Sequence, residues 1–162
     1  MINPKHVAGS MDLDALDRKI LDVLQDDVMI PLIDLAERVG SSKTVVWRRV
    51  QGYVDSGVIE RRVAVLDPKK IGYNFTVFAL VKILRRNANS LPGFVEAVKT
   101  IPQVIDCHTT LGQVDFLLKI VVSDIDEYRE VVWSRLSQLD VQEISSLVSF
   151  DQPVKRSRLK LV

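Results

Sequence analysis

The stretch from Leu32 to Ile59 constrains the fold of this chain more than any other segment. Apolar residues recur at helical spacing on both sides of Gly40-Ser41-Ser42, which predicts two short helices joined by a tight turn. Helix-turn-helix motifs have this plan, and their second helix enters the major groove of DNA. We therefore predict a helix-turn-helix unit whose second helix, which begins after Ser42, faces DNA.

The charge is unevenly distributed along the chain. The net charge of the 162 residues is only +1. Between Arg38 and Lys70, however, eight basic residues stand against three acidic ones, whereas acidic residues dominate from Asp12 to Asp34. Attraction to phosphate depends on local charge rather than on the total. The second predicted helix and the segment after it therefore carry the positive potential that a DNA-binding surface needs.

Several classes of protein do not fit the composition. Cys107 is the single cysteine, so an intrachain disulfide and a cysteine zinc cluster are excluded, and we predict no metal site. There is no nucleophile paired with a base and no glycine-rich phosphate loop, so we do not expect an enzyme. No apolar run is long enough to span a bilayer, and we expect a cytoplasmic protein with no membrane partner. Cys107 is expected to pack in the core, with a thiol-responsive role as the alternative.

The chain divides into segments of different character. The Gly9-Ser10-Met11 junction leads us to expect that residues 1–10 (MINPKHVAGS) are a tag remnant and that Met11 is the natural start. We place the helix-turn-helix domain at 11–58, and within it a helix from Asp12 to Gln25 that is capped by Asp12 or Asp14. A strand or wing over Val58–Leu66 and the turn Asp67–Gly72 form a linker at 59–72. A second domain occupies 73–162.

The second domain has a regular order of elements. Its strands are predicted at 75–84, 103–111, 115–122 and 141–150, and its helices at 91–100 and 125–139. This β-α-β-β-α-β order predicts a ferredoxin-like, four-stranded antiparallel sheet with both helices on one face and an apolar open face. RNA-binding domains share the order, but they need stacking aromatics on the middle strands, and the aliphatic residues after Phe116 suit a protein interface better. The basic tail KRSRLKLV after Val154 could reach DNA, pack on a subunit or be disordered.

Taken together, these segments resemble one family. LDALDRKIL (13–21), LIDLAERVG (32–40), TVVWRRV (44–50), SGVI (56–59), LDPKKIG (66–72) and GQVDFLLKI (112–120) resemble the leucine-responsive/asparagine-responsive (Lrp/AsnC, feast/famine) transcriptional regulators. The resemblance implies an α+β protein, with a winged helix-turn-helix domain followed by a RAM/ACT-like ferredoxin domain. It also implies a bacterial or archaeal, nucleoid-associated regulator that forms dimers and then tetramers or octamers, and that responds to an amino acid.

The predicted DNA contacts lie mainly on the second helix of the motif. Arg48 suits guanine, and Gln51 suits adenine. Arg49 points sideways and either reaches DNA or pairs with Asp34 or Glu37. Gly52 is unusual inside a helix, and we interpret it as allowing close approach of a phosphate or a neighbouring helix. The full set of predicted DNA-binding residues is Ser42, Lys43, Thr44, Trp47, Arg48, Arg49, Gln51, Arg61 and Arg62, of which the last two either hold phosphates or are edge-strand charges.

The resemblance also places an effector site between the second and third strands of the second domain. Gly112 and Asp115 match the family's G-x-x-D pattern, while Leu111 and Val114 depart from it. A free amino acid has a carboxylate at one end and an ammonium group at the other. A glycine lets backbone amides approach the carboxylate, and an aspartate can accept hydrogen bonds from the ammonium group. The predicted effector-binding residues are Thr110, Leu111, Gly112, Gln113, Val114, Asp115 and Ser146. The alternative is a structural hairpin turn.

The sequence thus predicts a DNA-binding transcriptional regulator of the Lrp/AsnC type. Its expected partners are double-stranded promoter DNA, further copies of itself and an amino-acid-like effector, with no other cofactor. The alternative is a ligand-independent architectural regulator of the same fold. His108 is expected at an interface or a pocket wall, on the opposite face of its strand from Cys107.

Overall fold

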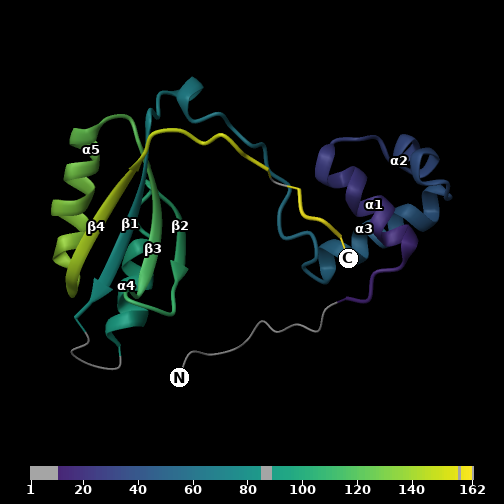
Figure 1. The fold of residues 1–162 in the computed structure, drawn as a ribbon. Coiled ribbons are helices and arrows are strands. Elements are labelled where there is room, and N and C mark those ends of the chain that lie inside the picture. The colour runs from purple at the N-terminus through teal and green to yellow at the C-terminus, as the bar shows by residue number, and fades with distance from the viewer. Residues whose placement is uncertain (1–10, 85–88, 157, 162) are drawn as a thin grey trace. The chain divides into compact units, whose positions relative to one another are not determined.

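The structure is a computed structural model that describes residues 11–84, 89–156 and 158–161. Its internal contacts divide the chain into two units (Figure 1). One unit contains the described residues up to Ala64 together with those from Val154 onward, and the other is Val65–Pro153. The C-terminal tail, which the sequence analysis placed with the second domain, therefore packs in the N-terminal unit.

Three helices build the N-terminal unit: α1 (Ala15–Asp26), α2 (Leu32–Val39) and α3 (Lys43–Asp55). Asp14 caps α1 through a capping box, in which Asp14 accepts from the Asp17 amide and Asp17 accepts from the Asp14 amide. Gly40 ends α2 with a φ of 70°, a backbone conformation that glycine adopts readily. Ser42 then caps α3. The predicted turn between the two helices is confirmed.

The core of this unit is apolar and draws on all three helices. Ile20 of α1, Leu35 of α2, and Val46 and Tyr53 of α3 are at most 2% exposed. These residues fall on one side of each helix, so the side of α3 that carries Arg48 stays in solvent.

The strand predicted over Val58–Leu66 is absent. Residues 60–67 have no regular structure, and only a short 3-10 turn, η1 (Lys69–Ile71), precedes the second unit. A strand needs a neighbour to complete its backbone hydrogen bonds. The sheet of the described residues contains β1 to β4 alone, so this segment has no such neighbour in the single chain.

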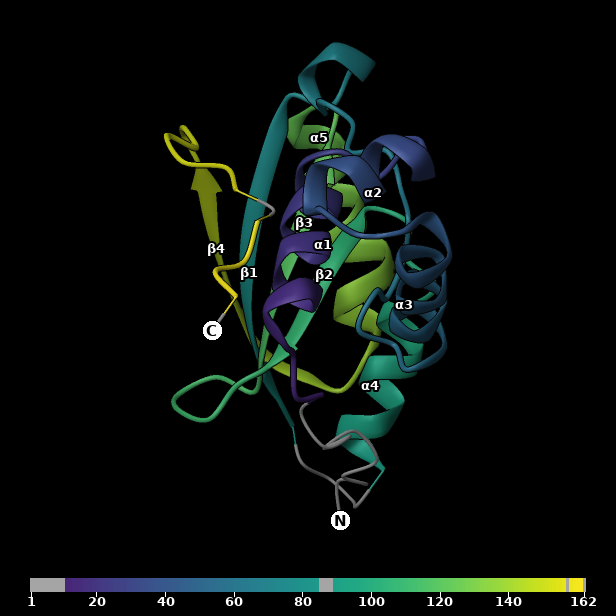
Figure 2. The same ribbon diagram turned by 90° about the vertical axis from the view of Figure 1, so that its right-hand side faces the viewer.

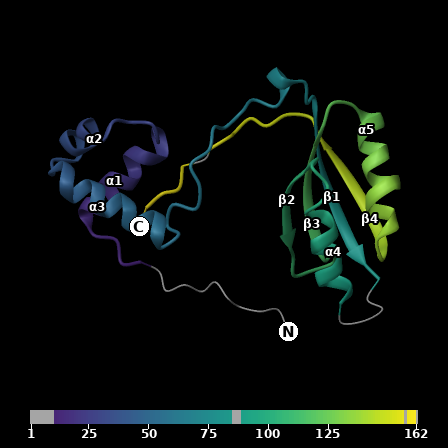
Figure 3. The same cartoon turned by 180° about the vertical axis from the view of Figure 1, so that it is seen from behind.

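The second unit contains the elements β1 (Phe75–Ile83), α4 (Ser90–Val98), β2 (Val104–Thr109), β3 (Phe116–Val122), α5 (Ile125–Glu130) and β4 (Val141–Ser149). The strands pair antiparallel in the order β2-β3-β1-β4, as Figure 3 shows. The predicted β-α-β-β-α-β fold is confirmed. Asp124 caps α5, but the single helix predicted over 125–139 changes to a π turn at Val131–Arg135 and a 3-10 turn at Leu136–Gln138.

The two faces of the sheet differ in what covers them. Val77, Ala79 and Val81 of β1 are fully buried against α4 and α5, which therefore share one face. The alternate residues of β1 point to the other face, where Phe78 pairs with Leu147 and Leu80 pairs with Leu117. Leu147 is 57% exposed. The open face is thus apolar at its centre, as predicted.

Candidate nucleic-acid interface and effector loop

The solvent side of α3 carries most of the predicted DNA-binding residues. Lys43, Thr44, Trp47 and Arg48 are exposed, and Gln51 is half-buried near the end of the helix. Trp47 is 55% exposed, an unusual position for so large an aromatic side chain in a small unit. The predicted positions therefore gather on one accessible helical surface that offers cationic, amide and aromatic groups.

The start of α3 is set by Ser42. Its hydroxyl accepts from the Val45 amide at 3.3 Å, which satisfies one of the free amides of the first turn. Lys43 follows at the first helical position, where the helix dipole also favours an anion. This end of α3 suits a phosphate group, with Ser42 serving chiefly as the cap.

A groove beside the end of α3 is lined by the end of this helix and by the segment that follows it. Gln51 of α3 lies with Arg61 and Arg62 around a cavity of about 230 Å³, which Val54, Ile59 and Glu60 also line. Arg61 and Arg62 are exposed, and the Arg61 guanidinium lies 4.0 Å from the Glu60 carboxylate. Because no strand forms here, the two arginines are not edge-strand charges in this structure.

Arg49 has a different position from its neighbour Arg48. Its Nη1 lies 2.7 Å from a carboxylate oxygen of Asp14 and 2.7 Å from one of Asp17. Tyr53 donates its hydroxyl to the same Asp17 oxygen at 2.5 Å. The prediction that Arg49 pairs with Asp34 or Glu37 is wrong, because Arg49 points toward α1. We therefore leave Arg49 out of the candidate interface.

The pKa of Asp17 reflects this network. Burial alone would raise the pKa of its carboxyl group, but the hydrogen bonds from Tyr53 and Arg49 outweigh burial and bring the pKa below its usual value. Burial and the hydrogen bond to Asp17 raise the pKa of Tyr53. Asp17 is thus held ionised between α1 and α3, and the network fixes the position of α3.

Gly52 lies in open space rather than against a close neighbour. A Cβ atom added at this residue would meet no atom within 4 Å. The interpretation that a neighbouring helix approaches closely at Gly52 is therefore wrong. Nothing else in the structure explains a glycine here.

The loop between β2 and β3 contains the predicted effector residues and projects from the sheet (Figure 2). Thr110 closes it, since its amide donates to the Asp115 carbonyl at 2.9 Å and its hydroxyl donates to the Val114 carbonyl at 2.6 Å. Gly112 has a φ of 156°, and Leu111 is fully exposed. The Asp115 carboxylate accepts from the Ile83 amide at 2.9 Å. Asp115 therefore also ties the loop to the end of β1.

Ser146 does not join this loop in the single chain. It lies on β4, and β1 and β3 separate β4 from β2 in the sheet. Its hydroxyl lies 2.5 Å from that of Tyr128 on α5, on the face of the sheet that the helices cover. The structure thus brings Thr110 to Asp115 together but places Ser146 elsewhere.

Cys107 and His108 point to opposite faces of β2, as expected. Cys107 pairs with Leu118 on the helix side, and His108 pairs with Leu117 on the open side. The prediction that Cys107 packs in the core is wrong, however, because this residue is exposed. It lines a groove of about 270 Å³ between β2 and α4, where partial desolvation raises the pKa of its thiol. A side chain on an edge strand is covered from one side only.

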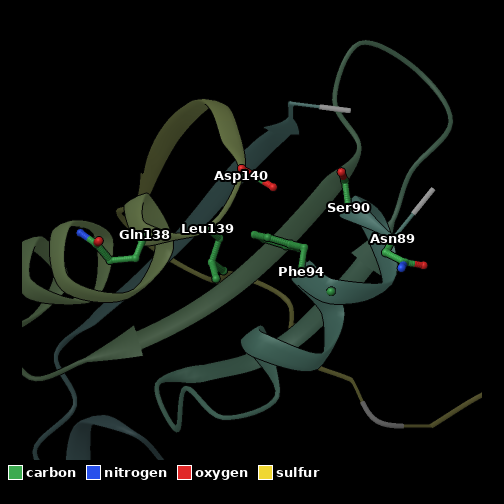
Figure 4. A pocket seen from close by; sticks show the side chains of 7 residues that line it. Asn89, Ser90, Phe94, Gln138, Leu139 and Asp140 are labelled. Carbon is green, nitrogen blue, oxygen red and sulfur yellow. The ribbon is translucent and has the colours of Figure 1, made fainter. Parts of the chain in front are cut away.

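A further cavity lies at the start of α4, and no motif of the sequence marks it. It measures about 340 Å³ and is lined by Asn89, Ser90, Gly93, Phe94, Gln138, Leu139 and Asp140. In Figure 4 the side chains of Ser90 and Asp140 lie on its two sides, one from α4 and one from the loop before β4.

Within residues 11–84, 89–156 and 158–161, no group of three His, Cys, Asp or Glu side chains is placed to hold a metal ion. In the same part of the chain, no helix has the length and apolar character needed to cross a membrane.

Comparisons with known proteins agree with this architecture. Residues 13–52 match the AsnC-type helix-turn-helix domain, and residues 76–159 match the Lrp/AsnC ligand binding domain. A proline dehydrogenase transcriptional activator from Rhizobium radiobacter is 38% identical over 146 residues, which cover 90% of this chain and 94% of the relative. A glutamate uptake regulatory protein from Zymomonas mobilis is 35% identical over 140 residues, covering 86% of this chain and 85% of the relative.

Solved structures extend the comparison. An AsnC family transcriptional regulator from Agrobacterium tumefaciens has a TM-score of 0.86 at 37% identity, covering 91% of this chain and 97% of that one. A regulator from Neisseria meningitidis, solved as a complex with L-Met, has a TM-score of 0.86 at 28% identity, covering 91% of this chain and 96% of that one. The fold and the helical surface define a DNA-binding transcriptional regulator. The chain belongs to the Lrp/AsnC family, whose members are regulators rather than enzymes.

Proposed function

We propose that this regulator reads its operator through the solvent face of α3 and the groove beside it. The observation that carries the proposal is the gathering of Lys43, Thr44, Trp47 and Arg48 on one exposed side of a helix whose other side is buried. Arg48 can donate two hydrogen bonds to a guanine, and Gln51 can pair with an adenine. Lys43 at the helix start and Arg61 and Arg62 beside the groove would hold backbone phosphates.

The open face of the sheet supports a dimer. Phe78, Leu80, Leu117 and Leu147 form its apolar centre, and no helix among the described residues of the second unit covers it. Pairing of two such faces would bury these side chains. A dimer would present two copies of α3, so the operator should contain two related half-sites. Further association of dimers into tetramers or octamers is part of the proposal.

The effector of this proposal is an amino acid, bound beside the loop from Thr110 to Asp115. Support comes from the Lrp/AsnC ligand binding domain that the chain matches and from the L-Met complex of the Neisseria regulator. Gly112 would leave the loop amides open to a carboxylate, and the Asp115 carboxylate would accept from the ammonium group. Ser146 is distant from the loop in one chain, so its contribution would require another subunit.

A second candidate is a regulator of the same fold that binds DNA without an effector. One observation favours it: the Asp115 carboxylate already accepts from the Ile83 amide, which gives this residue a structural role without any ligand. Leu111 and Val114 also depart from the family pattern.

Light scattering of the purified protein against the twenty amino acids separates the two candidates. A sensor that binds two assembly states unequally shifts its mass with at least one amino acid. A constant mass with every amino acid, together with unchanged affinity for promoter DNA, would favour the effector-independent regulator.

A further inference from the structure

The C-terminal tail, defined here as Val154–Leu161, lies against the helix-turn-helix unit rather than against the sheet domain it follows. Its yellow trace ends beside the helices of that unit in Figures 1 and 3. The main chain of Leu159 is held by the Gln25 side chain of α1. The Leu159 amide donates to the Gln25 oxygen at 2.7 Å, and the Gln25 amide donates to the Leu159 carbonyl at 3.2 Å. This pairing is the one that a neighbouring strand would make.

Arg158 strengthens the contact by charge. Its guanidinium lies 3.2 Å from the Asp22 carboxylate and 3.1 Å from that of Asp26. These two aspartates are four residues apart, so they lie on the same side of α1. Leu161 then packs against the apolar core of the unit. Hydrogen bonds, ion pairs and apolar packing together make the tail a fourth component of the helix-turn-helix unit.

The tail changes the sign of the charge on this unit. Residues 11–64 contain ten acidic and eight basic residues, a net charge of −2. The tail contains Lys155, Arg156, Arg158 and Lys160 and has no acidic residue, so the assembled unit carries +2. Lys155, Arg156 and Lys160 are exposed, and none of them takes part in the docking contacts described above. The basic residues on and after α3 supply the local attraction to phosphate, and the tail cations add to it by making the net charge of the whole unit positive.

We propose that the tail is a functional part of the DNA-binding surface. Arg158, Gln25 and Leu161 dock the tail on α1, and the three exposed cations then offset the acidic residues of α1 and raise the affinity for DNA. The inference rests on the DNA-binding role of this unit, but not on which side chains of α3 read bases. It predicts a contribution to affinity that is independent of DNA sequence and sensitive to salt.

The test compares a full-length charge variant and a tail-truncated variant with the wild type. The Lys155→Gln/Arg156→Gln/Lys160→Gln variant keeps the docking contacts and removes three charges. The other variant ends at Pro153 and loses both docking and charge. Binding to a short duplex of random sequence is measured by fluorescence anisotropy from about 50 to 200 mM salt. Hydrogen exchange of the α1 amides reports whether the tail is docked.

We expect the triple variant to retain the exchange protection of α1 and to bind DNA about 3- to 30-fold more weakly at low salt. The slope of log affinity against log salt concentration should become shallower by roughly 1 to 3. The truncated protein also loses Arg158, so it should lose at least as much affinity as the triple variant and, in addition, show faster exchange in α1. Wild-type affinity and salt dependence in the triple variant would overturn the proposal. Arg48→Ala, measured in parallel on promoter DNA, tests the role of α3 separately, so the two proposals fail independently.

Discussion

Arg49 of α3 donates to the Asp17 carboxylate of α1 across 2.7 Å, whereas Arg48, its neighbour in the sequence, is exposed to solvent. Two adjacent arginines therefore have different roles in the same helix. One holds α3 against α1, and the other is available to DNA. The Arg49 contact adds to the packing of the buried face of α3, while the opposite face stays in solvent.

Removal of Arg49 should destabilise the protein. Asp17 is only 4% exposed, and Arg49→Ala would leave its charge without a cation. The Arg49 side chain is 29% exposed, which reduces the effect by solvent screening. We expect the free energy of unfolding to fall by about 1–3 kcal/mol in chemical denaturation. Arg48→Ala is the matched control and should change it by less than about 0.5 kcal/mol. Equal stabilities of the two variants would contradict this assignment.

The same network predicts a loss of stability in acid. The pKa of Asp17 lies below its usual value in the folded protein, so its stabilising contribution is fully present above the unfolded pKa of about 3.9. That contribution disappears as the pH falls through the lower, folded pKa, because the carboxyl group then binds a proton in both states. Denaturation of wild type and Asp17→Asn from about pH 6 downward should show a steeper decline for wild type. Parallel curves would show that Asp17 makes no such contribution.

The open sheet face should control assembly. Leu147→Arg places a charge at the apolar centre of this face, where Phe78 is the paired residue on β1. Light scattering should report a smaller assembly for this variant than for wild type, because burial of an unpaired charge is costly. Trp133→Arg is the control, since Trp133 is 65% exposed on the turn after α5. An unchanged mass for Leu147→Arg would place the dimer interface on another surface.

The effector loop is best tested with Asp115→Asn. The substitution removes the charge expected to hold an ammonium group but keeps a side-chain oxygen that can accept from the Ile83 amide. Asp115→Ala would remove both and would confuse ligand binding with folding. We expect Asp115→Asn to keep its affinity for DNA and to lose any change in mass that an amino acid causes in wild type. A retained response would locate the effector elsewhere.

Local signals of the sequence were reliable guides to the fold. Asp14, Ser42 and Asp124 each cap a helix, and each satisfies a backbone amide within three residues of itself. Gly40 ends α2 in the left-handed conformation that its position suggested. These features depend on chemistry within one turn of helix, which a sequence displays directly. The order of strands in the second unit follows similarly from alternation and spacing.

Long-range features were missed for the opposite reason. Arg49 and Asp17 are 32 residues apart, and Gln25 and Leu159 are 134 residues apart, so no local pattern links them. The strand predicted at Val58–Leu66 has the β-branched residues of a strand but lacks a neighbour. Cys107 has the character of a core residue, but its edge strand leaves it exposed. In each case the decisive partner, present or absent, belongs to the tertiary structure.

The candidate site was predictable in part. The exposed face of α3 follows from helical periodicity, which places Thr44, Trp47 and Arg48 opposite the buried Val46 and Val50. The grouping of Gln51 with Arg61 and Arg62 around one groove required the path of the chain after α3. The wrong partner for Arg49 arose because helical spacing shows which side a residue faces but not which helix lies there.

Binding of promoter DNA by Arg48→Ala is the most direct test of the central claim that α3 reads the operator. Anisotropy titrations of wild type, Arg48→Ala and Arg49→Ala on the same duplex, at a temperature where all three are folded, give the comparison. Loss of the Arg48 guanidinium should weaken specific binding by roughly 1–3 kcal/mol and leave the assembly unchanged. Arg49→Ala should lose less affinity than Arg48→Ala, because its guanidinium faces α1 rather than solvent. Wild-type affinity in Arg48→Ala would contradict the assignment of α3 as the recognition helix.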